Sequence, residues 1–185
     1  MKVLDQALNG VVLIEPTVHG DDRGYFKEVV HPDKMAEVGI HHGFVQTNHS
    51  RSQQWTLRGL HFQHAPYGQA KLVRAVRGSI LDVVVDVRPN SDTFGQSYAA
   101  TLTDANHHML YVPIGFAHGF LALTDVDVEY FCSDIYSAQS EGSIHYTTFT
   151  DWPLPEGVSP IVSSKDADAA SLEAIKDTLH WPVGT

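Results

Sequence analysis

The stretch Lys71-Leu-Val-Arg-Ala-Val-Arg-Gly-Ser-Ile-Leu-Asp-Val-Val-Val-Asp-Val87 indicates the fold more directly than any other part of the chain. Two apolar runs, Lys71–Val76 and Ser79–Val87, are separated by the turn residues Arg77 and Gly78. Valine and isoleucine favour extended backbone, whereas glycine favours the tight turn between strands. The stretch therefore predicts a strand, a turn and a second strand.

Short apolar segments separated by glycine, proline, asparagine and aspartate continue on both sides of this stretch. This rhythm predicts an all-β fold of about ten strands. Because no long helix separates the strands, we expect a sandwich or barrel rather than a parallel α/β sheet. The other expected strands are Val11–Ile14, Tyr25–Val30, Phe44–Ser50, Thr56–Gln63, Ser97–Leu102, His108–Val112, His118–Leu123 and Val126–Asp134.

Helix signals are confined to two short segments. Pro32–Val38 has a proline at the first helical position, where its missing N–H costs nothing, and a second helix is expected over Ser171–Leu179. The stretch Trp152–Pro155 is interpreted as a loop that joins the sheets to a C-terminal tail. Since neither an internal repeat nor a linker is evident, residues 1–185 are expected to form one domain.

The charge of the chain limits the classes of partner that it can bind. Twelve lysines and arginines face 22 aspartates and glutamates, which gives a formal net charge of −10 at pH 7. Nucleic acids and anionic membranes attract a basic face, so we expect neither as a general partner. An anionic small molecule would need a local cluster of cations.

The number of cysteines and the length of the apolar runs indicate the cellular compartment of the protein. Cys132 stands alone, so it can form neither an intrachain disulfide nor a cysteine zinc site. The early apolar run Val11–Ile14 is too short for a signal-peptide core, and no run approaches the roughly 20 apolar residues of a membrane span. These features predict a cytoplasmic protein.

A histidine, a lysine and two tyrosines, His61, Lys71, Tyr130 and Tyr136, lie on or beside successive expected strands. In a closed sheet they can meet in one cavity, where a base, a cation and a weak acid move protons beside a carbonyl. Each also has an ordinary interpretation, as a hydrogen-bonded surface histidine, a solvated strand lysine, or tyrosines of the core or surface.

The residues around His61 favour a functional role for this histidine. Strict alternation along its strand would place it on one face with Gly59 and Gln63. Arg58 lies in the same strand and Arg74 shortly after it, in a chain otherwise short of basic residues. This density of cations favours a functional interpretation of the segment.

Lys71 and Tyr130 supply the other two chemical roles. Lys71 is the only lysine between Lys34 and Lys165. A fixed cation at a cavity wall can stabilise a developing enolate by ~3 kcal/mol or more. A tyrosine hydroxyl, with a pKa of about 10, can give a proton to a carbanion whose parent carbon acid is much weaker.

The segment Tyr111-Val-Pro113-Ile-Gly115-Phe-Ala-His118 has the Pro-x-Gly-x-x-His pattern of the second cupin motif, which is typical of a jelly-roll turn. Metal-binding cupins also need a His-x-His pair followed by a glutamate. His61 and His64 are three residues apart and would fall on opposite faces of a strand. A metal site is therefore not expected, and the pair His107-His108 is interpreted as solvated.

Segments spread over nearly the whole chain carry a family resemblance. They are Gly20–Glu28 (GDDRGYFKE), Gln46–Ser50 (QTNHS), Leu57–Gln63 (LRGLHFQ), Lys71–Arg74 (KLVR), Asp82–Arg88 (DVVVDVR), Pro113–Phe120 (PIGFAHGF) and Ser164–Ala167 (SKDA). Together they resemble the dTDP-4-dehydrorhamnose 3,5-epimerase family, the cofactor-free cupins of deoxysugar biosynthesis. The resemblance implies a jelly roll, active as a homodimer that exchanges N-terminal strands.

The resemblance also implies a reaction, the conversion of dTDP-4-dehydro-6-deoxy-D-glucose to dTDP-4-dehydro-L-rhamnose without metal or coenzyme. Carried over to this sequence, it makes His61 the general base and Asp166 the carboxylate that orients it. Lys71 matches the cation near the 4-keto oxygen, and Tyr130 matches the acid on the opposite face of the sugar. One base and one acid can serve both carbons that flank the ketone.

The resemblance assigns further residues to substrate binding. Tyr136 matches an aromatic residue that packs near the substrate, and His118 matches an active-site neighbour without an assigned role. Arginine suits bidentate contact with phosphate. Arginines at the matched positions would supply the local cation cluster that an anionic ligand needs on an acidic protein. Positions matched to thymidine or diphosphate contacts are Arg23, Phe26, Glu28, Gln46, Asn48 and Arg58.

Departures from the family pattern leave alternatives open. Ala70 stands where the family commonly has glycine, and Phe131 and Ser133 replace lysine and threonine, without removing an expected catalytic group. The alternatives are an epimerase acting at carbon 3 or carbon 5 alone, a metal-dependent cupin enzyme, and a non-catalytic sugar-nucleotide binding module. The last would have no need to keep His61 and Asp166 together.

Overall fold

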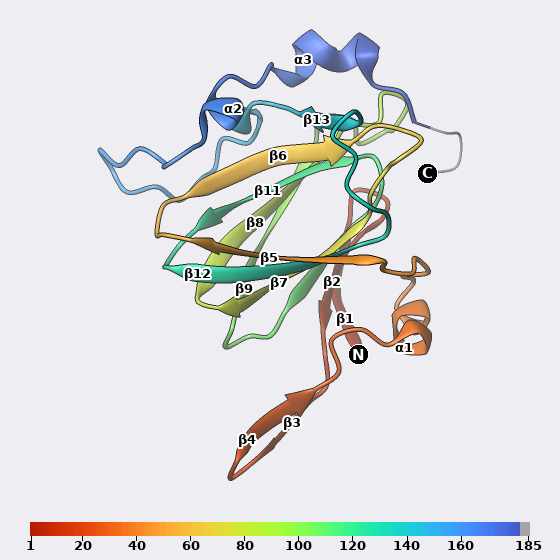
Figure 1. Cartoon of the computed structure of the whole chain (residues 1–185), viewed down its shortest axis with the longest axis vertical. Coiled ribbons are helices and arrows are strands. Elements are labelled where there is room, and N and C mark those ends of the chain that lie inside the picture. The colour runs from red at the N-terminus through yellow and green to blue at the C-terminus, as the bar shows by residue number, and fades with distance from the viewer. Residues whose placement is uncertain (182–185) are drawn as a thin grey trace.

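The computed structural model describes residues 1–181, and most of their regular structure is β-strand (Figure 1). The strands are β1 Lys2–Ala7, β2 Val11–Glu15, β3 Val18–Asp21, β4 Gly24–Lys27, β5 Gln46–Ser52, β6 Leu57–Gln63, β7 Lys71–Arg77, β8 Ser79–Asp86, β9 Ser97–Thr103, β10 Met109–Val112, β11 Phe116–Ala122, β12 Val126–Cys132 and β13 Glu141–Ser143. The helices are α1 Pro32–Glu37, α2 Ser164–Ala167 and α3 Leu172–Ile175, with 3-10 turns η1 Tyr146–Thr148 and η2 Lys176–Thr178.

Two antiparallel sheets face each other as a cupin jelly roll (Figure 1). One sheet has the strand order β1-β2-β10-β7-β12-β5, and the other has the order β13-β6-β11-β8-β9. Strands β7 and β8 are joined by the short turn at Gly78 but belong to different sheets. The turn therefore carries the chain from one layer to the other.

The all-β expectation is confirmed, with differences at the ends of the chain. The N-terminal helix begins at Pro32 as expected, whereas the expected strand Tyr25–Val30 ends at Lys27. The expected C-terminal helix Ser171–Leu179 is broken into α3 and the 3-10 turn η2. Strands β1, β3 and β13 and helix α2 were not expected, because they are short or largely polar.

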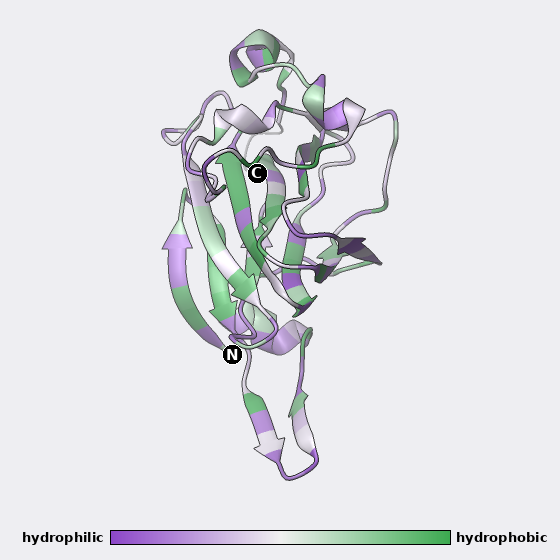
Figure 2. Ribbon diagram, turned by 90° about the vertical axis from the view of Figure 1, so that its left-hand side faces the viewer, coloured by the Kyte–Doolittle hydropathy of each residue, from purple (hydrophilic) through white to green (hydrophobic). Residues whose placement is uncertain are grey.

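The continuous apolar run of β8 is explained by two cores. Val84 packs between the sheets with Val73 and Phe120, whereas Val83 and Val85 point the other way. The latter two pack in a separate core beneath the C-terminal segment. A strand covered on both faces has no need for polar alternation. Figure 2 shows that the strands of the body carry most of the hydrophobic residues.

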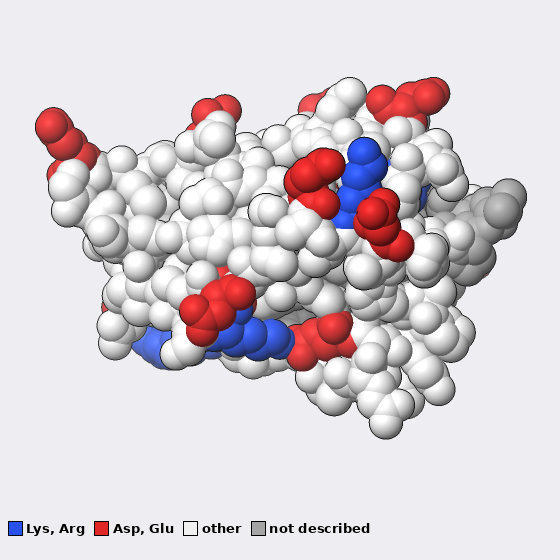
Figure 3. Space-filling model, turned by 90° about the horizontal axis from the view of Figure 1, so that it is seen from above, with Lys and Arg blue, Asp and Glu red and all other residues white. Residues whose placement is uncertain are grey.

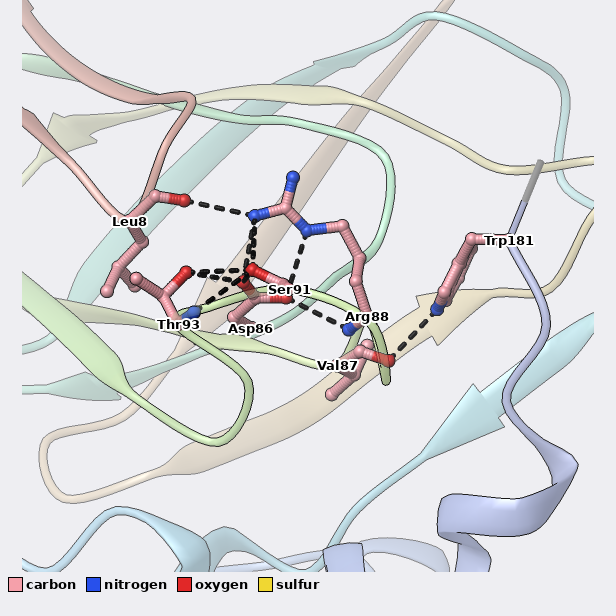
Figure 4. A network of polar contacts seen from close by, with 7 residues as sticks. All are labelled: Leu8, Asp86, Val87, Arg88, Ser91, Thr93 and Trp181. Carbon is pink, nitrogen blue, oxygen red and sulfur yellow. Dashed lines mark hydrogen bonds and ion pairs between the residues drawn. The ribbon is translucent and has the colours of Figure 1, made fainter. Parts of the chain in front are cut away.

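A buried carboxylate pins the loop after β8 (Figure 4). Asp86 is fully buried and accepts hydrogen bonds from Arg88 (2.8 Å), Ser91 (2.6 Å) and Thr93 (2.6 Å). Burial opposes its ionisation, but these hydrogen bonds hold the pKa of Asp86 below its usual value. Arg88 also donates to the carbonyl of Leu8, which ties the β1–β2 turn to this loop.

The hairpin of β3 and β4 projects from the body and belongs to neither sheet (Figure 1). All residues of β3 are exposed. Two aromatic side chains are exposed on β4, Tyr25 at 59% and Phe26 at 65%. An isolated two-stranded hairpin is only marginally stable in water, so this projection needs contacts elsewhere.

The surface agrees with the composition. On the face seen in Figure 3, lysine and arginine side chains form small groups beside acidic ones rather than a broad basic patch. Over residues 1–181, no helix is long and apolar enough to cross a membrane.

Candidate active site

Two adjoining cavities open between the sheets, and His61, Lys71 and Tyr130 line both of them. The first has a volume of about 490 Å³ and the second about 510 Å³. The first is also lined by Ser50, Thr56, Leu57, Arg58, His118, Gly119, Phe120, Ile161, Val162, Ser163, Lys165 and Asp166. The second is also lined by Gln46, Thr47, Asn48, His49, Phe62, Gln63, Gln69, Tyr136 and Glu141. The three shared residues, His61, Lys71 and Tyr130, lie where the two cavities meet, a place that we call the junction.

A register shift in β6 brings Arg58 to the same cavity as His61. His118 pairs with His61 across the two strands, but Phe120 pairs with Arg58, so β6 has one more residue than β11 between these pairs. Gly59 lies inside this bulge with a φ of +113°, a conformation that glycine adopts without strain. The strict alternation expected from the sequence is therefore wrong here, because the bulge resets the side-chain faces.

His61 and Asp166 form a close pair. Nε2 of His61 lies 2.5 Å from Oδ1 of Asp166, and the His61 side chain remains 31% exposed. An ionised carboxylate only accepts hydrogen bonds, so Nε2 carries the proton and Nδ1 is left as the basic atom. Burial opposes ionisation of Asp166, but hydrogen bonding and charge attraction from His61 hold its pKa below the usual value.

Asp166 reaches β6 because the C-terminal segment folds back onto that strand. Thr56 and Ile161 form a parallel β-bridge, and Leu57 N–H donates to the Ile161 carbonyl at 2.9 Å. Helix α2 then begins with Ser163 as its N-cap, whose hydroxyl accepts from the Asp166 N–H at 3.1 Å. The dyad is therefore fixed by the backbone as well as by its own hydrogen bond.

Lys71 lies at the start of β7 beside the buried thiol of Cys132, with which it is paired in register. Loss of water around the ammonium group lowers the pKa of Lys71, and electrostatic interactions with Cys132, Asp82 and Glu141 oppose that change. Asn48 donates to the Cys132 sulfur at 3.7 Å. Lys71 is thus a partly desolvated cation on the cavity wall.

Tyr130 stands on the opposite side of the junction from His61. It lies on β12 in one sheet, whereas His61 lies on β6 in the other. Burial raises the pKa of the Tyr130 hydroxyl, which Arg58 and Asn48 partly offset. A molecule held between the sheets would therefore have a base on one face and a neutral acid on the other.

A second histidine–carboxylate pair lies beside the first, because His118 on β11 is paired in register with His61 on β6. Nε2 of His118 is 2.7 Å from Oδ1 of Asp82, and the side chains are 8% and 0% exposed. The other oxygen of Asp82 is buried and has no hydrogen-bond partner among the described residues. His118 therefore lines the first cavity with an anion fixed behind it.

Glu141 and Lys165 join the site, although the sequence analysis did not identify them as site residues. Glu141 forms an ion pair with Lys165 and accepts from the Tyr136 hydroxyl at 3.0 Å. The Tyr136 N–H donates to the side chain of Gln46 at 2.9 Å. Lys165 belongs to the motif that contains Asp166, but Glu141 lies on β13, a strand that its residue types do not predict.

Three expected binding residues do not reach either cavity of their own chain. Arg23 is 90% exposed at the hairpin tip and pairs with Asp21. Phe26 lies on the projecting strand β4 and lines a separate cavity of about 280 Å³. Glu28 follows the hairpin and pairs with Lys34. In this chain they lie on or beside the projecting hairpin, away from both cavities.

The alternative of a metal-dependent cupin would require His61, His64 and His118 to converge on a metal. No group of three histidine, cysteine, aspartate or glutamate side chains is placed to hold a metal among residues 1–181. The ring of His64 stacks on Trp181, with centroids 6.2 Å apart, and lines neither cavity. His61 and His118 are instead bound to separate carboxylates.

Comparisons with known proteins agree with this geometry. Residues 5–174 match the family model described as dTDP-4-dehydrorhamnose 3,5-epimerase. The chain is 43% identical over 169 residues to a dTDP-4-dehydrorhamnose 3,5-epimerase of Methanothermobacter thermautotrophicus, covering 89% of this chain and 91% of that protein.

Solved structures show the same similarity. A crystal structure of dTDP-6-deoxy-D-glucose-3,5-epimerase from Legionella pneumophila, in complex with dTDP-4-keto-L-rhamnose, has a TM-score of 0.90 and 40% identity over 98% of this chain and 99% of that one. A 3'-monoepimerase from Streptomyces bikiniensis, in complex with dTDP-quinovose, has a TM-score of 0.84 and 32% identity over 91% of this chain and 87% of that one.

Proposed function

The chain belongs to the dTDP-4-dehydrorhamnose 3,5-epimerase family, and from this membership we propose how its own residues perform the reaction. The substrate is dTDP-4-dehydro-6-deoxy-D-glucose and the product dTDP-4-dehydro-L-rhamnose. One observation carries the proposal: His61 and Tyr130 face the same junction from opposite sheets, with Lys71 on its wall. Inversion of a carbon needs a base and an acid on opposite faces.

Each inversion moves one proton out and one proton in. Nδ1 of His61 takes the proton from carbon 3 or carbon 5, and the C–H electron pair forms the double bond of an enolate. Lys71 stabilises the enolate oxygen, which was the 4-keto oxygen. Tyr130 then gives its proton to the opposite face of the same carbon, and the ketone is restored. Exchange with water returns His61 and Tyr130 to their starting forms.

Nucleotide binding in this proposal uses the second cavity and a neighbouring subunit. Gln46, Asn48 and Tyr136 line the second cavity, where their polar and aromatic groups suit a nucleotide. A homodimer that exchanges N-terminal strands would bring Arg23 and Phe26 of one subunit to the cavities of the other. Their exposure on a projecting hairpin supports this arrangement.

Two broader features belong to the same proposal. Residues 1–185 would act as one jelly-roll epimerase domain, since residues of the site come from both sheets and from the C-terminal segment. A cytoplasmic location is supported by Cys132, a free and buried thiol.

The proposal is tested by proton NMR of the substrate in deuterated water, with purified protein and a chelator. We expect the signals of the protons at carbons 3 and 5 both to disappear. A partner reductase should then trap a product with the L-rhamnose configuration. If neither proton exchanged, the assigned substrate would be wrong.

A second candidate, epimerisation at one carbon, is favoured by the likeness to the Streptomyces bikiniensis 3'-monoepimerase. The same experiment separates the two. Disappearance of the carbon 3 signal alone would identify a single-site epimerase on the shared scaffold. Loss of activity with the chelator, restored by added metal, would instead favour the metal-dependent alternative.

Replacement of Tyr130 by phenylalanine tests the role of the acid. The Tyr130→Phe variant should still exchange substrate protons with solvent, because His61 remains. Product formation should fall by about 10²-fold, because the directed return of the proton is lost. The two rates are measured by NMR exchange and by reductase-coupled assay, and an equal fall in both would contradict the assignment.

A further inference from the structure

The projecting hairpin contacts a loop histidine of the body that the function above does not use. Nζ of Lys27, at the end of β4, lies 2.9 Å from Nδ1 of His107 in the β9–β10 loop. The ring of Tyr25 also lies against His107, with centroids 4.8 Å apart. The interpretation of His107 as a solvated turn residue is therefore wrong, because it contacts two residues of β4.

The loop that carries His107 is itself fixed. Asn106 accepts hydrogen bonds from the N–H groups of Thr103 and His108, both at 3.0 Å, and donates to the carbonyl of Thr101 at 2.9 Å. His107 has a φ of +59°, in the left-handed region. The body thus presents the imidazole from a constrained position, whereas the hairpin has little packing of its own.

The chemistry of the contact requires a neutral imidazole. The Lys27 ammonium group only donates hydrogen bonds, so Nδ1 of His107 must accept and cannot carry a proton. Burial, followed by the charge of Lys27, lowers the pKa of His107, and Asp104 opposes this. Burial and the charge of Arg74 likewise lower the pKa of Lys27. The groups that face His107 are Tyr25 and Lys27 from β4, Arg74 from β7, and Asp104 and His108 from its own loop.

We infer that His107 is a positioning residue that anchors the β3–β4 hairpin and so sets the placement of Arg23 and Phe26. This inference rests on the proposed function, in which these two side chains complete the site of a neighbouring subunit. Lys27, four residues after Arg23 and next to Phe26, passes the constraint from the loop to both. His107 itself does not touch the substrate.

Two substitutions at one position separate anchoring from mere packing. His107→Ala removes the acceptor. His107→Asn keeps one, because the asparagine Oδ1 occupies the place of the imidazole Nδ1, and asparagine tolerates a positive φ. His108→Ala, at the adjacent histidine of the same loop, is the matched control. All are compared as the intact enzyme.

The first readout is independent of catalysis. Trypsin cleaves after Arg23, and the fragment that ends there is followed by mass spectrometry. We expect His107→Ala to be cleaved about three- to tenfold faster than wild type, the range expected for loss of one hydrogen bond, with His107→Asn and His108→Ala close to wild type. Equal cleavage of His107→Ala and wild type would overturn the inference, whatever the enzyme's activity.

The second readout is the division between KM and kcat. His107→Ala should raise KM for the nucleotide sugar about three- to tenfold with little change in kcat, and His107→Asn should restore KM. In wild type, KM should also rise at acid pH, because protonation of His107 abolishes the acceptor. The midpoint of this rise should lie below the usual histidine pKa of about 6.5, since burial and Lys27 lower the pKa of His107. His107→Asn should lack this rise.

The outcomes divide cleanly. Faster cleavage without a change in KM would overturn the positioning role, and His107→Asn behaving like His107→Ala would overturn the role of the acceptor. If wild type itself failed to turn over the substrate, the proposed function would fall. The cleavage rates would still decide whether His107 holds the hairpin.

Discussion

The pairs His61–Asp166 and His118–Asp82 have the same chemistry and lie on neighbouring strands, but they differ in access to the cavities. His61 is 31% exposed and its carboxylate partner comes from the C-terminal segment. His118 is 8% exposed and its partner is fully buried within β8. Both imidazoles leave Nδ1 free of the carboxylate.

The difference shows that a histidine–carboxylate pair is not by itself a catalytic group. His61 lines both cavities together with Tyr130, and in the proposed mechanism its free nitrogen takes the substrate proton. His118 lines one cavity with a buried anion behind it. The outer pair is suited to proton transfer, and the inner pair to fixing charge near Lys71.

The largest expected effect is the loss of the outer imidazole. His61→Asn should lower kcat by about 10³- to 10⁴-fold, because the variant lacks the base that the proposed mechanism uses. Binding of dTDP, measured by calorimetry, should change little. His118→Asn is the matched variant of the inner pair and should retain far more turnover. Equal losses in both would erase the distinction between the pairs.

Asp166→Asn should have the next largest effect. The amide group of asparagine can donate to Nε2 of His61, which moves the ring proton to Nδ1 and blocks the base. We expect kcat to fall about 10²- to 10³-fold while the free energy of unfolding changes by about 1 kcal/mol or less. Denaturant titration checks the folding, and a variant that kept wild-type kcat would show that Asp166 does not orient His61.

Asp82→Asn should have a smaller effect, mainly on KM. The inner carboxylate orients His118, which lines the cavity without taking the proton, so its loss should weaken substrate binding by about three- to tenfold. The measurement is steady-state kinetics beside Asp166→Asn. A kcat loss as large as that of Asp166→Asn would assign a proton-transfer role to the inner pair.

The smallest expected effect is a shift of the alkaline limb of activity. Burial lowers the pKa of Lys71 whereas it raises that of Tyr130, and we assign the alkaline limb to loss of the Lys71 proton. The negative charge of Asp82 favours protonated Lys71, and Asp82→Asn should therefore move the limb of kcat to lower pH by a few tenths of a unit. Asp166→Asn should not move it. A shift to higher pH would contradict this sign.

The fold was predictable where one residue type dominated a segment. The valines of β8 and the turn at Gly78 indicated strands in their correct places. Strand β1 was not predicted because half of KVLDQA is polar. Among the described residues it pairs with β2, at the edge of its sheet. Strand β13 was not predicted because EGS has no strand propensity. Its extended conformation comes from its pairing with β6.

The central residues of the site were predictable from residue type and family resemblance, and the structure brings His61, Lys71, Tyr130 and Asp166 together. Contacts that depend on how distant segments pair in the fold were not predictable from the sequence. The bulge at Gly59 cannot be read from alternation, because it is defined by the strand beside it. Nothing in the sequence near Glu141 connects it with Lys165, since the contact exists only after both segments fold onto β6.

The return of the C-terminal segment to β6 has a consequence for synthesis on the ribosome. The hydrogen bond between His61 and Asp166 joins residues 105 positions apart. Contacts between distant residues form slowly, because a long loop must first close. A nascent chain that ends before Ser163 could thus pair most of its strands and still lack the carboxylate of its base. In the proposed mechanism, such a chain would lack catalytic competence until the segment around Asp166 had been made and had folded onto β6.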